Sequence, residues 1–548
     1  MSFFKKFLLY LLIIVGSVVA IVATVLAIMY FAPGTKVLGY QYSIYNAEKK
    51  VEFNSTTAIK PTDFEAIEVN SNLTKVFFKP SNKADTVYYI HKEGLSGFVK
   101  VENSKLYVSA KVENKSFSEE VGGTKYKTLV LDVVEPQGVA LSENSPIITV
   151  FIPSNLKVLS ANTEKAEIGF TTKNEEFTSN VEKFYANSTA GGNILIREPK
   201  FTKNYYLYTT KGSVTFENPE VVSANIKFTT DNGKLSLING DKAQLTGNLE
   251  VYSYLENKGP KLEFGKINGN VKITADYVDF SAKQVGLKEN QSSLAITTNQ
   301  SVINVNNIYA RFTLASKISK NKNEVTIGRL YYNKTADDHI LDVGMGSITI
   351  ADTVGAVGID ATSGNVTVNN AYDNVKIATT TGNIFVKFNP DAMLDGAEKE
   401  VAGSLVIDTN EGNVEIKNMR GELNVKTTSI KADLKMDVHY LDIKKNSMIV
   451  AKNRNVNITT TTSEKIQAGN TCRLLLVAGT ADFGLSSGLR SQIVSGDKDF
   501  ITTPEYNSQY RMGYAKSSSD GVYTNGLYDN YYGQIVVNTT GKITVSAA

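Results

Sequence analysis

A nine-residue repeat between residues 346 and 425 constrains the fold of this chain more than any other feature. Each unit opens with a turn residue, and its third and fifth residues are apolar and favour β-strands. Alternate side chains of a strand point to opposite faces, so positions three and five face inward together. The units begin at Gly346, Gly355, Gly364, Asp373 and Gly382 and, after an insertion at Asn389–Val401, at Gly403, Gly412 and Gly421.

A five-residue strand followed by a four-residue corner cannot bury its own apolar side, whereas stacked coils can. The repeat therefore predicts a β-solenoid, which we place at 185–548. The opening Gly or Asp supplies a turn residue that tolerates positive φ, and Thr at the corners could form a hydrogen-bonded ladder. Looser copies of the unit begin at Gly192, Gly212, Gly233, Gly247, Gly269 and Gly541.

The repeat also fixes a register that a structure can test. Val366 and Ile384 hold the third position of their units and should face inward. Thr367 and Phe385 hold the fourth position and should face outward. Phe385 is the sharper test, because hydrophobicity alone would place its ring inside. A shift of one residue would reverse every one of these assignments.

Residues Phe7–Phe31 form an uncharged apolar run that is long enough to cross a bilayer as a helix. Lys5 and Lys6 precede this run, which favours an N-terminus inside the cell at 1–6. The run is longer than the apolar part of a signal peptide and lacks a small-x-small cleavage site. We therefore expect a single-pass protein of the cytoplasmic membrane, with the rest of the chain exported.

Residues 38–180 alternate polar and apolar positions in short runs such as Ala66–Val69 and Thr128–Val133. This period of two predicts strands, and no comparable stretch has helical spacing. The fold class is therefore all-β: a transmembrane helix, a β-sheet region and a long β-solenoid. The net charge of +3 over 548 residues gives no indication of a nucleic-acid partner.

Two parts of the sequence resemble a bacterial adhesin-like β-repeat family. The first is Ile148–Pro153 followed by Leu156–Thr163, and the second is Thr362–Val368. The resemblance spans about residues 60–430 and implies a membrane-anchored or exported β-solenoid-like protein. Some members accompany cell-envelope stress systems, and the family has no catalytic residues to carry over. The longer array and the Tyr-rich C-terminal region depart from its pattern.

Residue types that carry chemistry are sparse and scattered. The three histidines His91, His339 and His439 show no metal-ligand spacing. Cys472 is the only cysteine, which excludes an internal disulfide, and we interpret it as a small buried residue. Phosphate-loop and dinucleotide motifs are absent from the sequence, as is the GGxGxD motif of calcium-binding repeats. We expect no catalytic residue, metal or cofactor.

Two carboxylate pairs keep an enzymatic alternative open. Asp337 and Asp338 precede His339, and Asp497 lies near Asp499. Glycosidases use paired carboxylates, and a β-helix can carry such pairs on one face. The alternative is therefore a carbohydrate-active enzyme on a β-helix scaffold.

Seven tyrosines gather in a Gly-, Ser- and Asn-rich insertion at about 503–534. Tyrosine with these small polar residues is typical of adaptable binding surfaces. The same rings could instead pack on the flank or end of a solenoid. The predicted binding residues are Tyr506, Tyr510, Tyr514, Tyr523, Tyr528, Tyr531 and Tyr532.

These patterns favour a surface-displayed, non-catalytic, adhesin-like binding or scaffold protein. Its expected partners are a cell-envelope polysaccharide or another surface protein, besides the membrane that holds its N-terminal helix. A third possibility, besides the enzyme, is an envelope-stress accessory protein that binds a membrane partner.

Overall fold

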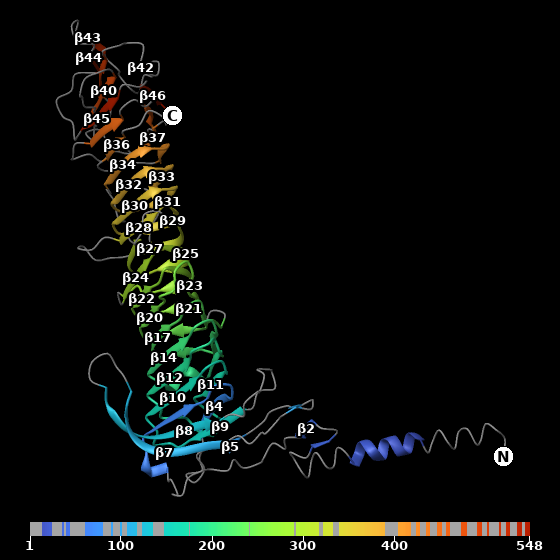
Figure 1. Cartoon of the computed structure of the whole chain (residues 1–548). Coiled ribbons are helices and arrows are strands. Elements are labelled where there is room, and N and C mark those ends of the chain that lie inside the picture. Colours follow the sequence, from blue (N-terminus) through green and yellow to red (C-terminus); the bar gives the residue numbers. More distant parts are fainter. Residues whose placement is uncertain are drawn as a thin grey trace, which may run out of the picture. The chain divides into compact units, whose positions relative to one another are not determined.

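The structure is a computed structural model of the whole chain. The residues it describes are 14–24, 36–37, 40–43, 61–80, 89–90, 99–100, 107–117, 123–134, 147–174, 176–239, 242–289, 292–316, 322–331, 339–388, 404–417 and 423–427, followed by short strands up to residue 547. The chain divides into two compact units, Met1–Gly247 and Asn248–Ala548. In both units most strands pair in parallel, and most successive strands along the chain alternate between two sheets (Figure 1).

In unit 1 the alternation begins at β3 and β4. One sheet contains β3 (Ala66–Asn70), β8 (Lys125–Val134), β10 (Val158–Thr163), β12 (Lys183–Ser188), β14 (Asn204–Thr209) and β17 (Asn225–Thr229), with β7 (Tyr107–Ser116) antiparallel to β8. The other contains β4 (Lys75–Pro80), β9 (Ile147–Ile152), β11 (Ile168–Thr171), β13 (Ile194–Arg197), β15 (Ser213–Glu217), β16 (Val221–Val222), β18 (Lys234–Leu237) and β19 (Gln244–Leu245), with β5 (Tyr89–Ile90) antiparallel to β9. The 38–180 region therefore contributes strands to the same parallel ladders as the repeats after it.

Unit 2 contains the regular repeat. Its first sheet includes β20 (Leu249–Tyr252), β22 (Val271–Thr274), β24 (Ser292–Thr298), β26 (Ala310–Ser316), β28 (His339–Gly344), β30 (Val357–Ser363), β32 (Val375–Thr381), β34 (Leu405–Glu411), β36 (Leu423–Thr427) and β38 (Ser447–Ala451). Its second sheet includes β21 (Lys261–Ile267), β23 (Tyr277–Val285), β25 (Gln300–Ile308), β27 (Asn323–Tyr331), β29 (Ser347–Val354), β31 (Val366–Ala371), β33 (Ile384–Phe388), β35 (Val414–Lys417), β37 (Leu434–Val438) and β39 (Val456–Thr460).

The nine-residue unit is half of a coil. Consecutive units lie in opposite sheets, so the neighbour of Val366 in its sheet is Ile384, eighteen residues later. In all eight units the third and fifth residues are at most 3% exposed, as the repeat predicts. The apolar core of the coil therefore lies between the two sheets, which face each other.

The predicted register is confirmed. Val366 and Ile384 are at most 1% exposed, whereas Thr367 and Phe385 are half-buried on the outer side of their strands. The Phe385 ring lies under the ammonium group of Lys417, with 5.4 Å between Nζ and the ring centroid. A cation over an aromatic face is a favourable contact, and it holds this ring outside the core.

Glycine is required where the corners of adjacent coils meet. The φ angles of Gly364, Gly382 and Gly412 are 133°, 133° and 109°, which is the region where glycine is favoured. A Cβ added to Gly364 would lie 1.9 Å from the carbonyl oxygen of Gly346. These glycines therefore use the positive φ that the opening position tolerates. Gly346 and Asp373, which open two other units, are not among the residues of positive φ.

The corners are also joined by a ladder of asparagines. The Oδ1 atom of Asn365 accepts a hydrogen bond from the Asn383 amide at 3.1 Å, and Asn383 accepts one from the Asn413 amide at 3.0 Å. The expected threonine contact occurs in unit 1, where the Thr209 hydroxyl donates to the Gly192 carbonyl at 2.9 Å. In the regular repeat, asparagine takes over the role expected of threonine.

Near the N-terminus, residues 14–24 are helical. In the part of the chain that the structure describes, no helix is long and apolar enough to span a membrane. The predicted transmembrane helix at 7–31 extends beyond the described residues on both sides of this segment, so it stays a prediction.

Candidate binding face

Few of the site residues predicted from the sequence lie in the part of the chain that the structure describes. Tyr514 lies on β43 (Tyr514–Lys516) and Tyr523 on β44 (Val522–Asn525), and these strands pair in antiparallel fashion. The cysteine, two of the histidines, both acidic pairs and the other tyrosines lie outside the described residues; these are Cys472, His91, His439, Asp337, Asp338, Asp497, Asp499, Tyr506, Tyr510, Tyr528, Tyr531 and Tyr532. Their predicted roles remain predictions.

His339, at the start of β28, is fully buried in the core of unit 2. Its Nδ1 atom accepts a hydrogen bond from the Phe312 amide at 3.1 Å. Burial and, as the smaller cause, the positive charge of Arg311 together lower the pKa of the imidazole to about 3. A neutral, buried histidine that accepts a backbone hydrogen bond has a structural role here.

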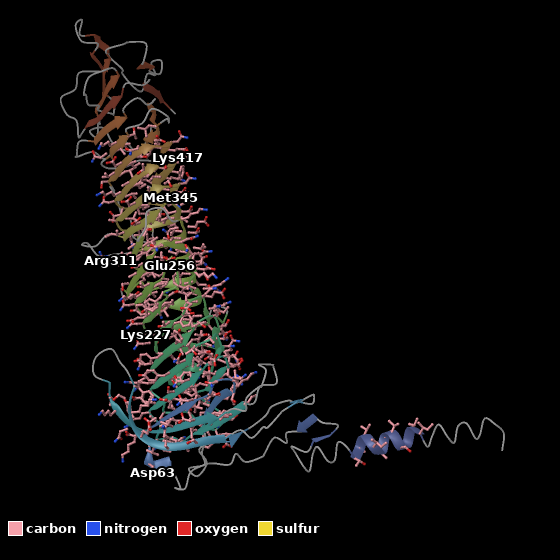
Figure 2. The ribbon with its side chains drawn as sticks, viewed as in Figure 1. Asp63, Lys227, Glu256, Arg311, Met345 and Lys417 are labelled. Carbon is pink, nitrogen blue, oxygen red and sulfur yellow. The ribbon has the colours of Figure 1, made fainter. Side chains whose placement is uncertain are left out.

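A row of aromatic and amide side chains lies on the outer face of unit 1. Along β12 and β14 the inward positions are buried, so the alternating positions turn outward. Parallel pairing aligns Tyr185 with Tyr206, Asn187 with Tyr208, and Tyr206 with Lys227. All five side chains are half-buried. We call these five residues the tyrosine face; Lys227 on β17 is labelled in Figure 2.

Two of the three tyrosine rings of this face, those of Tyr185 and Tyr206, are held by stacking. The centroids of Tyr185 and Tyr206 are 4.4 Å apart with an interplanar angle of 7°. Phe117, which follows β7, stacks on Tyr185 at 5.4 Å and packs against Ala66 and Val158. Stacked aromatic pairs contribute about 0.5–1.5 kcal/mol beyond their burial. The rings are therefore fixed before any ligand arrives.

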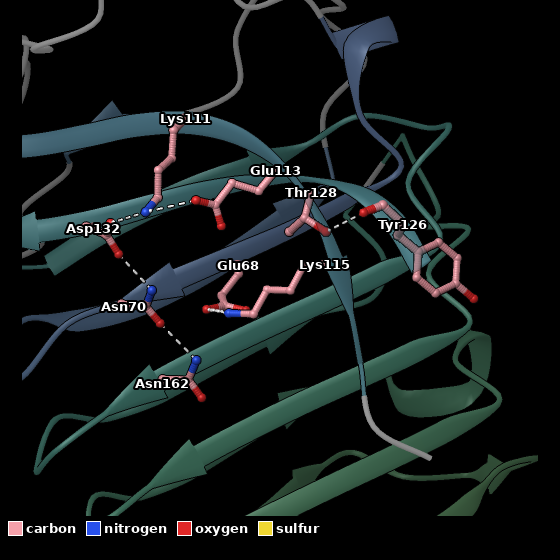
Figure 3. A network of polar contacts seen from close by, with 9 residues as sticks. All are labelled: Glu68, Asn70, Lys111, Glu113, Lys115, Tyr126, Thr128, Asp132 and Asn162. Atoms are coloured by element: carbon pink, nitrogen blue, oxygen red, sulfur yellow. Dashed lines mark hydrogen bonds and ion pairs between the residues drawn. The ribbon is translucent and has the colours of Figure 1, made fainter. Parts of the chain in front are cut away.

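A polar ladder leads along the sheet to this face (Figure 3). The Asn70 amide donates to Asp132 at 2.8 Å, and the Asn162 amide donates to Asn70 at 2.9 Å. Asn187 of the tyrosine face is the next residue of this row, because it pairs with Asn162. The polar row thus reaches the tyrosine face at Asn187, where the next position of the row is Tyr208.

The β7–β8 hairpin closes this end of the sheet. Lys115 forms an ion pair with Glu68, a carboxylate that is only 3% exposed on β3. Lys111 approaches Glu113 at 3.1 Å and Asp132 at 3.7 Å (Figure 3). Charged side chains on an edge strand discourage pairing with another sheet. The hairpin therefore protects the edge and places Phe117 against the tyrosine face.

One carboxylate pair in unit 2 was not expected from the sequence. Asp342 on β28 and Asp360 on β30 are partners in the parallel ladder. Burial raises the pKa of Asp360, and the charge of Asp342 raises it further. The Asp342 carboxylate accepts a hydrogen bond from the Gly344 amide at 3.1 Å. Two neighbouring carboxylates are one component of glycosidase chemistry, which also needs a substrate groove.

A signal for the tyrosine face was present in the sequence. Lys183–Ser188 and Asn204–Thr209 lie twenty-one residues apart and carry aromatic rings at matching outward positions. Aligning the looser repeats strand by strand would have found it. The spacing of these coils varies, however, because β10 and β12 are offset by twenty-five residues, and this irregularity concealed the match.

Comparison with known proteins adds no relative: no family model, no curated protein and no solved structure matches this chain. Within the described residues, no group of three or more His, Cys, Asp or Glu side chains is arranged to hold a metal ion. The functional proposal therefore rests on the geometry of the chain itself.

Proposed function

We propose that this chain is a surface-displayed, non-catalytic binding protein of the adhesin-like kind, and that the tyrosine face of unit 1 is a binding surface. The observation that carries the proposal is the in-register stack of Tyr185 and Tyr206 beside Asn187. Tyrosine and asparagine combine apolar contact with adaptable hydrogen bonding. Rings that are fixed in advance lose little conformational entropy on binding.

The geometry favours an extended ligand. Equivalent positions in adjacent strands are about 4.8 Å apart, so the face offers tyrosine rings at successive positions across the coils, with the amide of Asn187 in the same rows. A polymer with a short repeat can contact several of these positions at once. A cell-envelope polysaccharide or an extended segment of another surface protein fits this pattern, and a membrane helix at 7–31 would hold the protein near either.

The strongest pKa shifts support a structural rather than a catalytic reading of the described titratable groups. His339 is a buried core residue, and burial likewise raises the pKa of Tyr205. The Tyr205 hydroxyl donates to the Pro199 carbonyl at 2.7 Å inside unit 1. Both groups are shifted mainly by desolvation within the core, away from the outer faces.

The test is binding by the full-length protein to immobilised envelope polysaccharides. The double variant Tyr206→Ala, Tyr208→Ala should bind at least about tenfold more weakly. Thr349→Ala, which changes an exposed residue on the outer face of unit 2, is the matched control and should bind as the wild type does. Unchanged binding by the double variant would show that the tyrosine face is not the binding surface. Turnover of a polysaccharide would show that the protein is an enzyme rather than a non-catalytic binding protein.

A further inference from the structure

The loop between β20 and β21 in unit 2 exposes a large aromatic side chain. Tyr254 is 81% exposed, more than any other large hydrophobic side chain among those described, and its neighbour Leu255 is 37% exposed. Residues 254–258 are all exposed, whereas Ser253 before them and Gly259 after them are buried. Glu256, in the middle of this loop, is labelled in Figure 2.

Both ends of this loop are fixed to neighbouring strands. The Ser253 amide donates to the Thr274 carbonyl at 2.9 Å. At the other end, a Cβ added to Gly259 would lie 1.7 Å from the Tyr277 carbonyl oxygen. The backbone at Gly259 therefore approaches the next coil so closely that only glycine fits there. The loop leaves and rejoins the body at two defined points.

The backbone of the loop includes an unusual conformation that hydrogen bonds from neighbouring residues stabilise. Asn257 has φ of 57°, a left-handed conformation that is sparsely populated outside glycine. Its amide donates to the Asp276 carboxylate, whose other oxygen accepts a hydrogen bond from the Asn299 side chain. Sparsely populated conformations that the surrounding structure holds in place occur preferentially at functional sites.

Folding alone does not account for Tyr254. A side chain that stays 81% exposed gains almost no burial, so the folded state derives little stability from its ring. This differs from Tyr185, whose ring stacks on both Phe117 and Tyr206. At Tyr254 the faces of the ring remain available for a ligand.

We propose that the loop at 254–258 is a carbohydrate-binding site, in which Tyr254 stacks on the apolar face of a sugar ring. The size of the site favours a sugar over a protein: a stable protein interface needs about 20–30 residues on each side, whereas five residues are exposed here. One aromatic ring covers one sugar residue. Glu256, Asn257 and Lys258 follow Tyr254 in the loop, are also exposed, and carry donors and acceptors that suit sugar hydroxyls.

The site is separate from the tyrosine face and does not depend on it. It lies in the other unit and uses an open ring rather than a stacked one. Binding at Tyr254 can therefore fail while the tyrosine face binds, and the reverse is equally possible. The two proposals are tested by different variants.

The chain contains no tryptophan, so Tyr254→Trp introduces a single fluorescent reporter at the proposed site. The full-length variant is titrated with soluble hexamers of β-1,4-linked glucose and of β-1,4-linked N-acetylglucosamine, and with soluble peptidoglycan fragments. Stacking on a sugar should shift the tryptophan emission to shorter wavelength in a saturable way with at least one probe. Tyr208→Trp, made in the tyrosine face of an otherwise native chain, reports whether the same probe binds there instead.

Affinity is then measured by calorimetry on proteins without the reporter. Tyr254→Phe keeps the ring and should stay within about twofold of the wild type, whereas Tyr254→Ala should bind at least about tenfold more weakly. No emission change of the Tyr254→Trp variant with any probe, or equal affinity of the Tyr254→Ala variant and the wild type, overturns the proposal. Loss of a protein partner on Tyr254→Ala, without loss of sugar binding, also overturns it.

Discussion

At the scale of single residues, environment rather than residue type decides the role of each side chain. His339 is one of three histidines in the chain, and its burial makes it a neutral core residue. Sequence alone could not show this, because an isolated histidine carries no pattern that separates core from surface. Phe385 is the opposite case: the register of the repeat predicts its outward position, although its hydrophobicity does not.

The burial of His339 predicts a loss of stability in acid. In the unfolded chain this group binds a proton below its ordinary pKa of about 6.5, whereas in the folded protein it does so only near 3. Its contribution to stability is therefore complete above pH 6.5 and falls as the pH drops towards 3. At pH 5 the loss is about 2 kcal/mol.

The measurement is urea unfolding at pH 7.5 and pH 5 for the wild type and for His339→Gln. The variant cannot take up this proton, so its free energy of unfolding should fall by about 2 kcal/mol less between the two pH values. The carboxylates titrate in both proteins, so their effect on the free energy of unfolding cancels in the comparison. An identical fall in the two proteins would mean that His339 is not buried in its neutral form.

A second residue-scale prediction concerns the inward and outward positions of one strand. Val366→Asp places an unpaired charge in the core and should cost at least about 3 kcal/mol, whereas Thr367→Asp on the outer side should cost less than about 1 kcal/mol. Urea unfolding of both variants measures the difference. Equal costs, or a greater cost at Thr367, would show that the strand faces are assigned the wrong way round.

At the scale of the strand and its corner, the sequence predicted the repeat but not the coil. Nine residues make one strand and one corner, and both sheets use the same pattern, so the period alone does not show that two units form a turn of the solenoid. The asparagine ladder was also hidden. The sequence Gly-Asn-Val suits any tight turn, and only stacking shows that Asn383 accepts a hydrogen bond from the next coil.

The glycine corners give a prediction at this scale. Gly364→Ala forces a Cβ to within 1.9 Å of the Gly346 carbonyl oxygen at a φ of 133°, and should cost more than about 2 kcal/mol. Gly358→Ala is the matched control, because its nearest contact would be the His339 carbonyl oxygen at 3.6 Å. Thermal unfolding compares the two. A Gly364→Ala variant as stable as Gly358→Ala would contradict the close approach of the corners.

At the scale of the whole molecule, pattern and composition predicted a β-rich chain of stacked coils, and the described residues confirm a mostly β fold with two long, mainly parallel sheets. Pattern and composition did not predict the candidate sites. The density of tyrosines in the sequence favoured the cluster at 503–534, whereas the tyrosine face and Tyr254 depend on residues that the coils bring together or expose. A local count of residues cannot detect neighbours that lie about twenty positions apart.

The N-terminal run predicts the placement of the chain relative to a membrane. If 7–31 anchors the protein with its N-terminus inside, protease treatment of intact cells should remove the rest of the chain and leave a short membrane-bound fragment. An N-terminal tag, protected inside the cell, follows that fragment. A mature protein that starts near residue 33 would show instead that the run is cleaved off.

The segment between β33 and β34 has a practical consequence for engineering. Val375 pairs with Leu405 and Ile384 pairs with Val414, both thirty residues apart, although the neighbouring coils repeat every eighteen. Twelve additional residues thus enter the chain without shifting a single strand partner. Foreign sequences such as epitope tags or fluorophore-labelling peptides can be spliced in at this point, since the ladder on either side already tolerates an interruption of that length.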